Sequence, residues 1–461
     1  MTKTPSFNMH IFKNSYIIGI QFVILSILLV GFINYSSIIS YLYALIITVL
    51  LYVIIFKEYN SEVILLFGLY SLITIAIFLV QLISLPDYFG FSGGLGIGTD
   101  DSYFYSQITS DLPHGFPLRE GYDLYINKYS KMLIYITPFK ITHPFDVLFI
   151  NSIPITLLPL FTRGTALLYF KDKEIAWYAF VFMAICPYTL SNSLILIRDG
   201  WIATLMIGSI YFLHRKQYLL LIISVFLLFY LRIASGALGL FLLVIFMLTI
   251  QNELSKNIIN KIIRISFIAI IIISIIIFLS PIIIDYMKSK NIYGTIFRES
   301  IANRFFIEND SNSFYASILS QPAYIRIPLV SVFYVISPLF SPDSLVRNGV
   351  FIPRALLTSI IYPFLAIFYL KYFIQAIIYM FKNPIFKQRL LLLLYIFSII
   401  IISQLSLQPR HKTMIMPLFY LLVSSGLVYK ENIGKKFSNI IIIFLIFFQL
   451  LLFGLQNLKH L

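Results

Sequence analysis

Charged residues are scarce in this chain. Only 11% of its 461 residues are Asp, Glu, Lys or Arg, whereas 59% are hydrophobic. A soluble protein of this length carries about a quarter charged residues, so a soluble enzyme is excluded. The hydrophobic residues come in runs of about 18–20, the length that crosses the hydrocarbon core of a bilayer. The sequence therefore predicts an all-α, polytopic integral membrane protein.

Cysteine and acidic residues are also few. The single cysteine, Cys186, excludes a disulfide within the chain and a cysteine metal site. There are 19 Asp and Glu against 34 Lys and Arg, which gives a net charge of +15. In a soluble protein this excess would indicate nucleic acid, but Lys and Arg also accumulate in the short cytoplasmic loops of membrane proteins. We therefore expect a lipid bilayer, and no nucleic acid, as a partner.

The hydrophobic runs predict about 11–14 membrane helices in a single membrane domain, residues 1–461. The first run, 15–33, is too long for the apolar region of a signal peptide and predicts a membrane helix. Lys3 and Lys13 precede it and place the N-terminus in the cytoplasm. By parity, the polar links 57–62 and 171–174 and the basic link 214–216 are then cytoplasmic.

Two long polar stretches fall on the other side of the membrane. They cover residues 86–140 and 285–354, and we expect both to be extracytoplasmic loops. Within the second, residues 327–339 are apolar but too short and proline-broken for a clear span. This segment predicts a re-entrant or surface helix.

Four groups of charged residues interrupt or border the apolar runs on that outer side. A charged side chain at membrane depth costs roughly 2.5–3.5 kcal/mol on insertion scales, so it normally has a function. We expect these groups to face one outer cavity. They are Asp100-Asp101, Arg198-Asp199, Arg232 and Arg410-His411.

Three arginines at an outer membrane boundary indicate an anionic ligand, because guanidinium groups bind phosphate bidentately and stay charged at any pH. A membrane-soluble anion with a hydrophilic cargo is a polyprenyl-diphosphate-linked sugar. Aromatic side chains, Trp201 among them, offer flat faces for sugar rings. The candidate substrate-binding residues are Asp100, Tyr103, Tyr105, Arg119, Arg298, Arg304 and Arg326.

Each candidate also has a simpler interpretation. Arg232 and Arg410 lie at helix ends, from which arginine commonly reaches the lipid headgroups. Asp199 can cap a helix that begins at Trp201, and Asp100-Asp101 fits an ordinary turn after glycine. His411 fits an interfacial polar residue. The hypothesis of one site rests on the agreement of all four groups on one side.

These residues resemble the bacterial polysaccharide polymerases of the Wzy type, including the EpsG-like branch. The architecture covers the whole chain, and the local similarities are short. They are Gly98-Thr-Asp-Asp-Ser-Tyr-Phe-Tyr105, Ile197-Arg-Asp-Gly-Trp-Ile-Ala203, Leu231-Arg-Ile-Ala-Ser-Gly236 and Arg410-His-Lys-Thr-Met-Ile-Met-Pro417.

The resemblance implies a glycosyltransferase of the bacterial inner membrane. It would polymerise undecaprenyl-diphosphate-linked oligosaccharide repeat units into a surface polysaccharide such as O-antigen or capsule. The arginines Arg198, Arg232 and Arg410 would hold the diphosphate, and Asp101, Asp199 or His411 would accept the proton of the attacking hydroxyl. The scheme requires no cofactor or metal, and a chain-length regulator protein is a further candidate partner.

Two alternatives remain open. The acidic pair Asp100-Asp101 also resembles the outer-loop carboxylates of GT-C glycosyltransferases, which use a polyprenyl-phosphate sugar donor and sometimes a divalent metal. In that family the pair usually follows the first membrane helix, whereas here it follows about the third. A lipid-linked oligosaccharide flippase is the third hypothesis, but such a transporter typically shows internal repeats and charges through the depth of the helix bundle.

Overall fold

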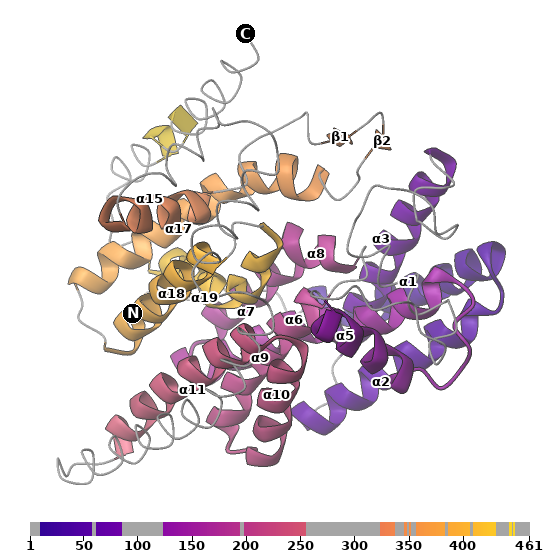
Figure 1. Cartoon of the computed structure of the whole chain (residues 1–461), viewed down its shortest axis with the longest axis horizontal. Helices are drawn as coiled ribbons and strands as arrows, with labels where there is room; N and C mark the ends of the chain where they lie inside the picture. The colour runs from indigo at the N-terminus through magenta and orange to yellow at the C-terminus, as the bar shows by residue number, and fades with distance from the viewer. Residues whose placement is uncertain are drawn as a thin grey trace. The chain divides into compact units, whose positions relative to one another are not determined.

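The structure, a computed structural model, is helical (Figure 1). It describes residues 10–57, 61–84, 123–193, 198–254, 323–336, 345–347, 350–351, 356–382, 386–405, 409–429, 442–444 and 446–447. In this part of the chain the only strands are β1 (Val346–Arg347) and β2 (Val350–Phe351), which pair antiparallel. The predicted all-α class is confirmed.

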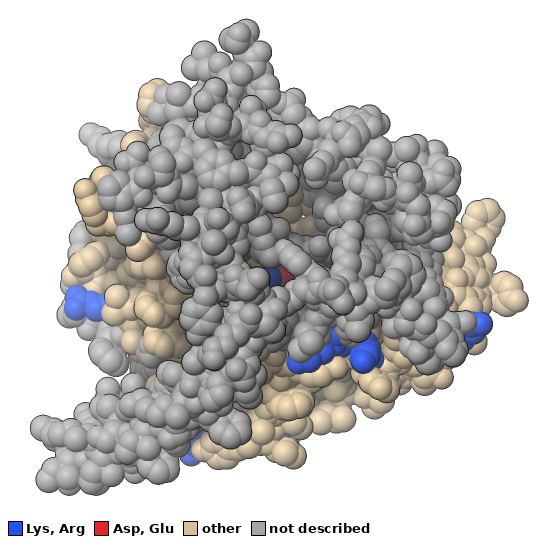
Figure 2. Space-filling view, in the orientation of Figure 1, with Lys and Arg blue, Asp and Glu red and all other residues tan. Residues whose placement is uncertain are grey.

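Five helical segments are long and apolar enough to cross a membrane, among the residues described. They are Ser15–Ile33 of α1 (His10–Ile33), α2 (Ser37–Phe56), Glu62–Val80 of α3 (Glu62–Ser84), Phe145–Phe170 of α6 (Pro144–Phe170), and Leu356–Phe381, formed by η3 (Leu356–Ile361) and α17 (Tyr362–Lys382). The visible face in Figure 2 agrees, because most of its described surface carries neither Lys, Arg, Asp nor Glu. The predicted membrane protein is confirmed at this level.

Other apolar helices are shorter or bent. α7 (Lys173–Ala184) and α8 (Pro187–Ser193) meet at an angle of 48° and form a sixth span if they cross together. Four further helices contain apolar segments of 10–17 residues. They are α10 (Tyr218–Leu231), α11 (Ile233–Leu254), α18 (Phe386–Leu405) and α19 (Met416–Val428).

The chain forms two compact units, and α6 is the central helix of the first. This unit comprises Met1–Gly208 with Ser341–Phe364. Within it, α2, α3 and α7 all pack on α6, and α1 lies along α3 (Figure 1). The apolar core of α6 is buried entirely by protein, whereas only 22% of the apolar segment of α1 is buried. A helix that is apolar all round is a buried one, so the outer helices separate α6 from lipid.

A buried carboxylate ties the start of α6 to the start of α2. Asp146, 2% exposed, accepts hydrogen bonds at Oδ1 from the hydroxyls of Ser37 (2.8 Å) and Ser40 (2.7 Å). Its Oδ2 accepts from the backbone N–H groups of Thr142 (2.8 Å) and His143 (2.9 Å). The His143 side chain completes a capping box by accepting from the Phe145 N–H. One side chain thus connects two segments that lie more than 100 residues apart in the sequence.

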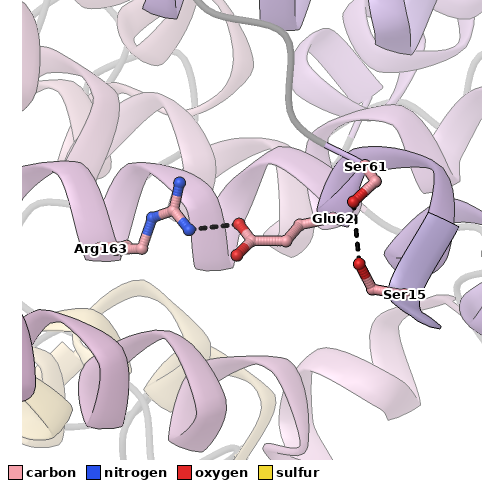
Figure 3. Close-up of polar contacts among 4 residues, drawn as sticks. All are labelled: Ser15, Ser61, Glu62 and Arg163. Carbon is pink, nitrogen blue, oxygen red and sulfur yellow. Dashed lines mark hydrogen bonds and ion pairs between the residues drawn. The ribbon is translucent and has the colours of Figure 1, made fainter. Parts of the chain in front are cut away.

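An ion pair ties the other half of α6 to α3. Figure 3 shows Arg163 of α6 reaching the carboxylate of Glu62, while the Ser15 hydroxyl of α1 lies 2.8 Å from that of Ser61. Glu62 is 2% exposed, and the Arg163 guanidinium also lies over the Phe180 ring of α7, 5.6 Å from its centroid. Removing one partner of a buried pair costs about 3–5 kcal/mol, so this pair holds α3, α6 and α7 in register.

Lysine follows three helices in the left-handed conformation. Lys57 after α2, Lys171 after α6 and Lys216 after α9 (Asp199–Arg215) have φ of 56°, 56° and 58°. Glycine or asparagine normally takes this position. A lysine there adds a positive charge beside the negative end of the helix dipole.

The second unit comprises Ser209–Phe340 with Leu365–Leu461. In it, α10 packs on α11, α15 (Ala323–Ile336) packs on α18, and α18 packs on α19. Gly426 of α19 permits close approach to α17, because a Cβ there would lie 1.9 Å from the Tyr372 carbonyl oxygen. Aromatic rings of α17, α18 and α19 fill this core. They include Tyr369, Phe373, Tyr395, Phe419 and Tyr420.

Two loop predictions can be compared with these helices. Residues 123–136 of the first predicted outer loop form helix α5 (Asp123–Ile136), in which Tyr129 and Leu133 are fully buried. Residues 327–336 of the apolar segment predicted at 327–339 belong to helix α15, and the rest of that segment lies outside the described residues. Whether α15 is re-entrant, and the count of 11–14 spans, stay predictions.

Candidate functional site

Several candidate residues lie outside the described part of the chain. These are Asp100, Asp101, Tyr103, Tyr105, Arg119, Arg298 and Arg304. For Arg326 in α15 and Arg410 in η4 (Pro409–Met414), only the backbone is described. The described candidates form two groups, Arg198 with Asp199 in the first unit and Arg232 with His411 in the second.

The first group lies at the start of α9. The helix begins at Asp199, two residues before the predicted start, so this carboxylate belongs to the first turn. A negative charge there is favourable beside the positive end of the helix dipole. Asp199 is 3% exposed, and Arg198 is half-buried. A Cβ at Gly200 would lie 2.8 Å from Ile155 Cγ1, so glycine allows the turn to press against α6.

A buried amide organises the surroundings of this turn. Asn151 of α6 accepts at Oδ1 from the Tyr129 hydroxyl (2.7 Å) and from Trp201 Nε1 (3.0 Å). Its Nδ2 donates to the Asn192 carbonyl at 3.4 Å. Close by, the Thr204 hydroxyl of α9 donates to the Pro154 carbonyl at 2.6 Å. Four side chains therefore fix α9 to α6 and α5.

The charges of Arg198 and Asp199 act on Tyr129. Burial raises the pKa of the Tyr129 hydroxyl well above its ordinary value; the negative charge of Asp199 raises it further, and Arg198 partly offsets this. The hydroxyl thus stays protonated and donates to Asn151. Sequence reasoning missed Tyr129 and Asn151. A polar side chain within the apolar run 145–170 was a usable signal for Asn151.

The second group joins residues 179 positions apart. Arg232 lies between α10 and α11 in an extended conformation (φ −164°, ψ 115°), which breaks the apolar helix there. Its Nη2 lies 2.9 Å from His411 Nε2. The tight α10–α11 connection requires Gly236, because a Cβ there would lie 2.5 Å from Phe229 Cγ.

The partner chemistry fixes the state of His411. A guanidinium only donates hydrogen bonds, so Nε2 must accept and carries no proton. His411 is 4% exposed and follows Arg410 in η4. In this arrangement the imidazole is neutral, and its one N–H proton lies on Nδ1. The contact orients the Arg232 guanidinium.

The next residue, Lys412, fastens η4 to α15. Its Nζ donates to the Val335 carbonyl at 2.8 Å and lies 5.4 Å from the centroid of the Tyr334 ring. Lys412 is 2% exposed, and a cation near the carboxyl end of α15 is favourable for the helix dipole. The Ser331 and Ser403 hydroxyls, 3.1 Å apart, add a tie between α15 and α18. His411 therefore contacts Arg232 from a segment, η4, that is itself held in place by α15.

Of the three hypotheses, only the GT-C transferase involves a metal. In the described ranges, no three His, Cys, Asp or Glu side chains gather as a metal site requires. The acidic pair 100–101 lies outside those ranges.

Comparison with known proteins identifies no relative. No protein-family model matches the chain, and no curated protein or solved structure is similar to it. The resemblance to Wzy-type polymerases rests on the sequence motifs and stays a hypothesis.

Proposed function

We propose that this protein polymerises undecaprenyl-diphosphate-linked oligosaccharide repeat units into a surface polysaccharide. The observation that carries the proposal is the Arg232 guanidinium, fixed by neutral His411 at a break between two apolar helices. A permanently charged, oriented guanidinium at membrane depth is costly unless it binds an anion. A lipid-linked diphosphate is the anion that reaches this environment.

The proposed reaction transfers a glycan between two lipid carriers. A hydroxyl oxygen of the acceptor sugar attacks the anomeric carbon of the donor glycan, and the bond from that carbon to the diphosphate oxygen breaks. The diphosphate leaves with the electron pair, and a carboxylate takes the hydroxyl proton. Both substrates carry a diphosphate, so the reaction needs arginine for each of them.

The roles of the described residues follow from their contacts. Arg198 and Arg232 are the guanidiniums that we assign to phosphate binding, with Arg410 as a third. Asp199 or Asp101 is the proton acceptor. We assign His411 to positioning, because its Nε2 lone pair is taken by Arg232.

We further propose an inner-membrane location with the N-terminus in the cytoplasm and 11–14 membrane helices. The left-handed lysine caps support this orientation, because Lys57, Lys171 and Lys216 all fall on the side that parity assigns to the cytoplasm. Positive charge accumulates on that side of membrane proteins.

Deletion of the gene tests the proposed function in cells. We expect the surface glycan to carry single repeat units, seen as loss of the long-chain ladder on a gel, and restoration by the wild-type gene. If the protein is a GT-C transferase, its deletion should instead remove one sugar from each repeat unit of the glycan. Chains of unchanged length in the deletion strain would contradict the polymerase, and chains unchanged in both length and sugar composition would contradict both functions.

A further inference from the structure

Trp201 has its indole N–H fixed inside the protein, and the residue as a whole is half-buried. The indole N–H donates to Asn151 Oδ1 at 3.0 Å, and Trp201 follows the buried Asp199 by two positions on α9. A buried indole normally finds a partner for its N–H. Here the partner holds the indole of a residue that is not fully buried.

Asn151, which accepts the indole N–H, is itself fixed in place. Asn151 is fully buried in α6, and its Oδ1 also accepts from the Tyr129 hydroxyl at 2.7 Å. Its amide nitrogen donates to the Asn192 carbonyl. Asn151 thus uses both ends of its amide, which fixes its rotamer and with it the plane of the indole. A face fixed in advance binds a ligand at lower entropic cost.

Polar groups suited to hydroxyls lie near the Tyr129–Asn151 pair that holds this ring. Arg198 is half-buried, and the buried Asp199 carboxylate shares the first turn of α9 with Trp201. The influence of both charges on the pKa of Tyr129 indicates that they lie near the same network. An apolar face with a few placed polar groups is the usual composition of a small-molecule site.

We propose that Trp201 is the face on which a pyranose ring of the glycan packs, and that Asn151 and Tyr129 are positioning residues for it. Arg198 donates to sugar hydroxyls or phosphate, and Asp199 accepts from a hydroxyl. This inference rests on the proposed function, because it names the sugar-binding part of the Arg198–Asp199 site. The competing role for Trp201 is an anchor in the lipid headgroups.

Tryptophan fluorescence tests this directly, because the chain has only two tryptophans. In the full-length protein with Trp177→Phe, Trp201 is the sole emitter. The probe is the mixture of oligosaccharides released by mild acid from the surface polysaccharide of the cells that carry the gene. We expect a saturable shift in emission and reduced quenching by acrylamide. No shift at saturating probe, together with strong quenching by brominated lipids, would overturn the proposal.

Substitutions of Asn151 distinguish its effect on the orientation of Trp201 from an effect on folding. Asn151→Leu removes the acceptor and should weaken probe binding about 3- to 10-fold, the range for one or two hydrogen bonds. Asn151→Asp keeps an acceptor for both donors but loses the donor to the Asn192 carbonyl, so its binding should lie between that of Asn151→Leu and that of the wild type. The matched control is Tyr43→Phe, which removes a hydroxyl bond to the Ile136 carbonyl elsewhere on α5. Equal binding by Asn151→Leu and the wild type, or equal weakening by the control, would contradict the role of Asn151.

The deletion strain distinguishes failure of the proposed polymerase function from failure of the proposed sugar-binding face at Trp201. If long glycan chains persist after deletion but the probe still shifts Trp201 emission, the sugar face stands and the polymerase function fails. If long chains are lost and the probe has no effect, the function stands and the sugar face fails. A further check uses glycan length in cells, where Trp201→Ala should shorten the chains more than Trp201→Phe, which keeps an aromatic face but loses the N–H bond to Asn151.

Discussion

His411 accepts a hydrogen bond from Arg232 across 179 residues of sequence, with Nε2 and Nη2 2.9 Å apart. The contact fixes the guanidinium and, at the same time, fixes the histidine as neutral. In the sequence these two residues belong to separate groups. In the structure they share one function, which is the orientation of a positive charge.

Substitutions at this pair should follow hydrogen-bond chemistry. We expect Arg232→Ala to abolish polymer formation and Arg232→Lys to restore little, because an ammonium lacks the bidentate fork. His411→Gln retains an acceptor and should keep at least about a tenth of the activity, whereas His411→Ala should lose about 10-fold or more. The measurement is glycan chain length at equal amounts of inserted protein. Full activity of His411→Ala would contradict the positioning role.

The Asp146 tie should dominate the stability of the first unit. In Asp146→Asn, an amide nitrogen replaces one carboxylate oxygen and meets either the two backbone N–H donors or the two serine hydroxyls. We expect a loss of about 2–3 kcal/mol, the value of hydrogen bonds to a charged group, measured by thermal unfolding in detergent.

Asp172→Asn is the matched control for this loss. Asp172 caps α7 by accepting from the Glu174 and Ile175 N–H groups, and asparagine caps as well as aspartate. Its unfolding temperature should therefore stay near that of the wild type. An equal loss in both variants would show that Asp146 has no special role.

Stability should fall as the pH drops below about 6.5, the ordinary pKa of histidine. Burial lowers the pKa of His143, and the nearby Asp146 only partly offsets it. Between the folded pKa and 6.5, the unfolded chain binds a proton that the folded chain excludes, so unfolding becomes easier as the pH falls. Protonation would also remove the acceptor for the Phe145 N–H.

The titration of His143 can be isolated by substitution. His143→Asn keeps a capping acceptor without a titrating group, so the fall in unfolding temperature between pH 7.5 and pH 5.5 should be smaller than in the wild type. An identical pH dependence in the two proteins would exclude His143 as the source.

The proposed orientation can be mapped with the single cysteine removed. Cys186 is buried, and a Cys186→Ser chain provides a cysteine-free background. A cysteine at Tyr35, which is 80% exposed between α1 and α2, should react with a membrane-impermeant maleimide in intact cells. A cysteine at Lys171 should react only after the membrane is opened. The reverse pattern would invert the topology.

The positions of membrane helices could be predicted from the sequence better than the contacts between helices. The predicted membrane helix over residues 15–33 lies within α1 and ends at the same residue, because helix length in a membrane is set by bilayer thickness. Helix α5 was missed because its polar sequence resembles a loop, although Tyr129 and Leu133 are buried. The pairings Glu62–Arg163 and Arg232–His411 depend on tertiary packing, which hydrophobic periodicity does not encode.

Reconstitution gives the most direct test of the central claim. The purified protein in liposomes would be supplied only with undecaprenyl-diphosphate-linked repeat units, and the products separated by length. We predict a ladder of extended glycans that forms without nucleotide sugars and is absent with Arg232→Ala. Failure of the wild type to extend these units, while it transfers a single sugar from a polyprenyl-phosphate donor, would contradict the account.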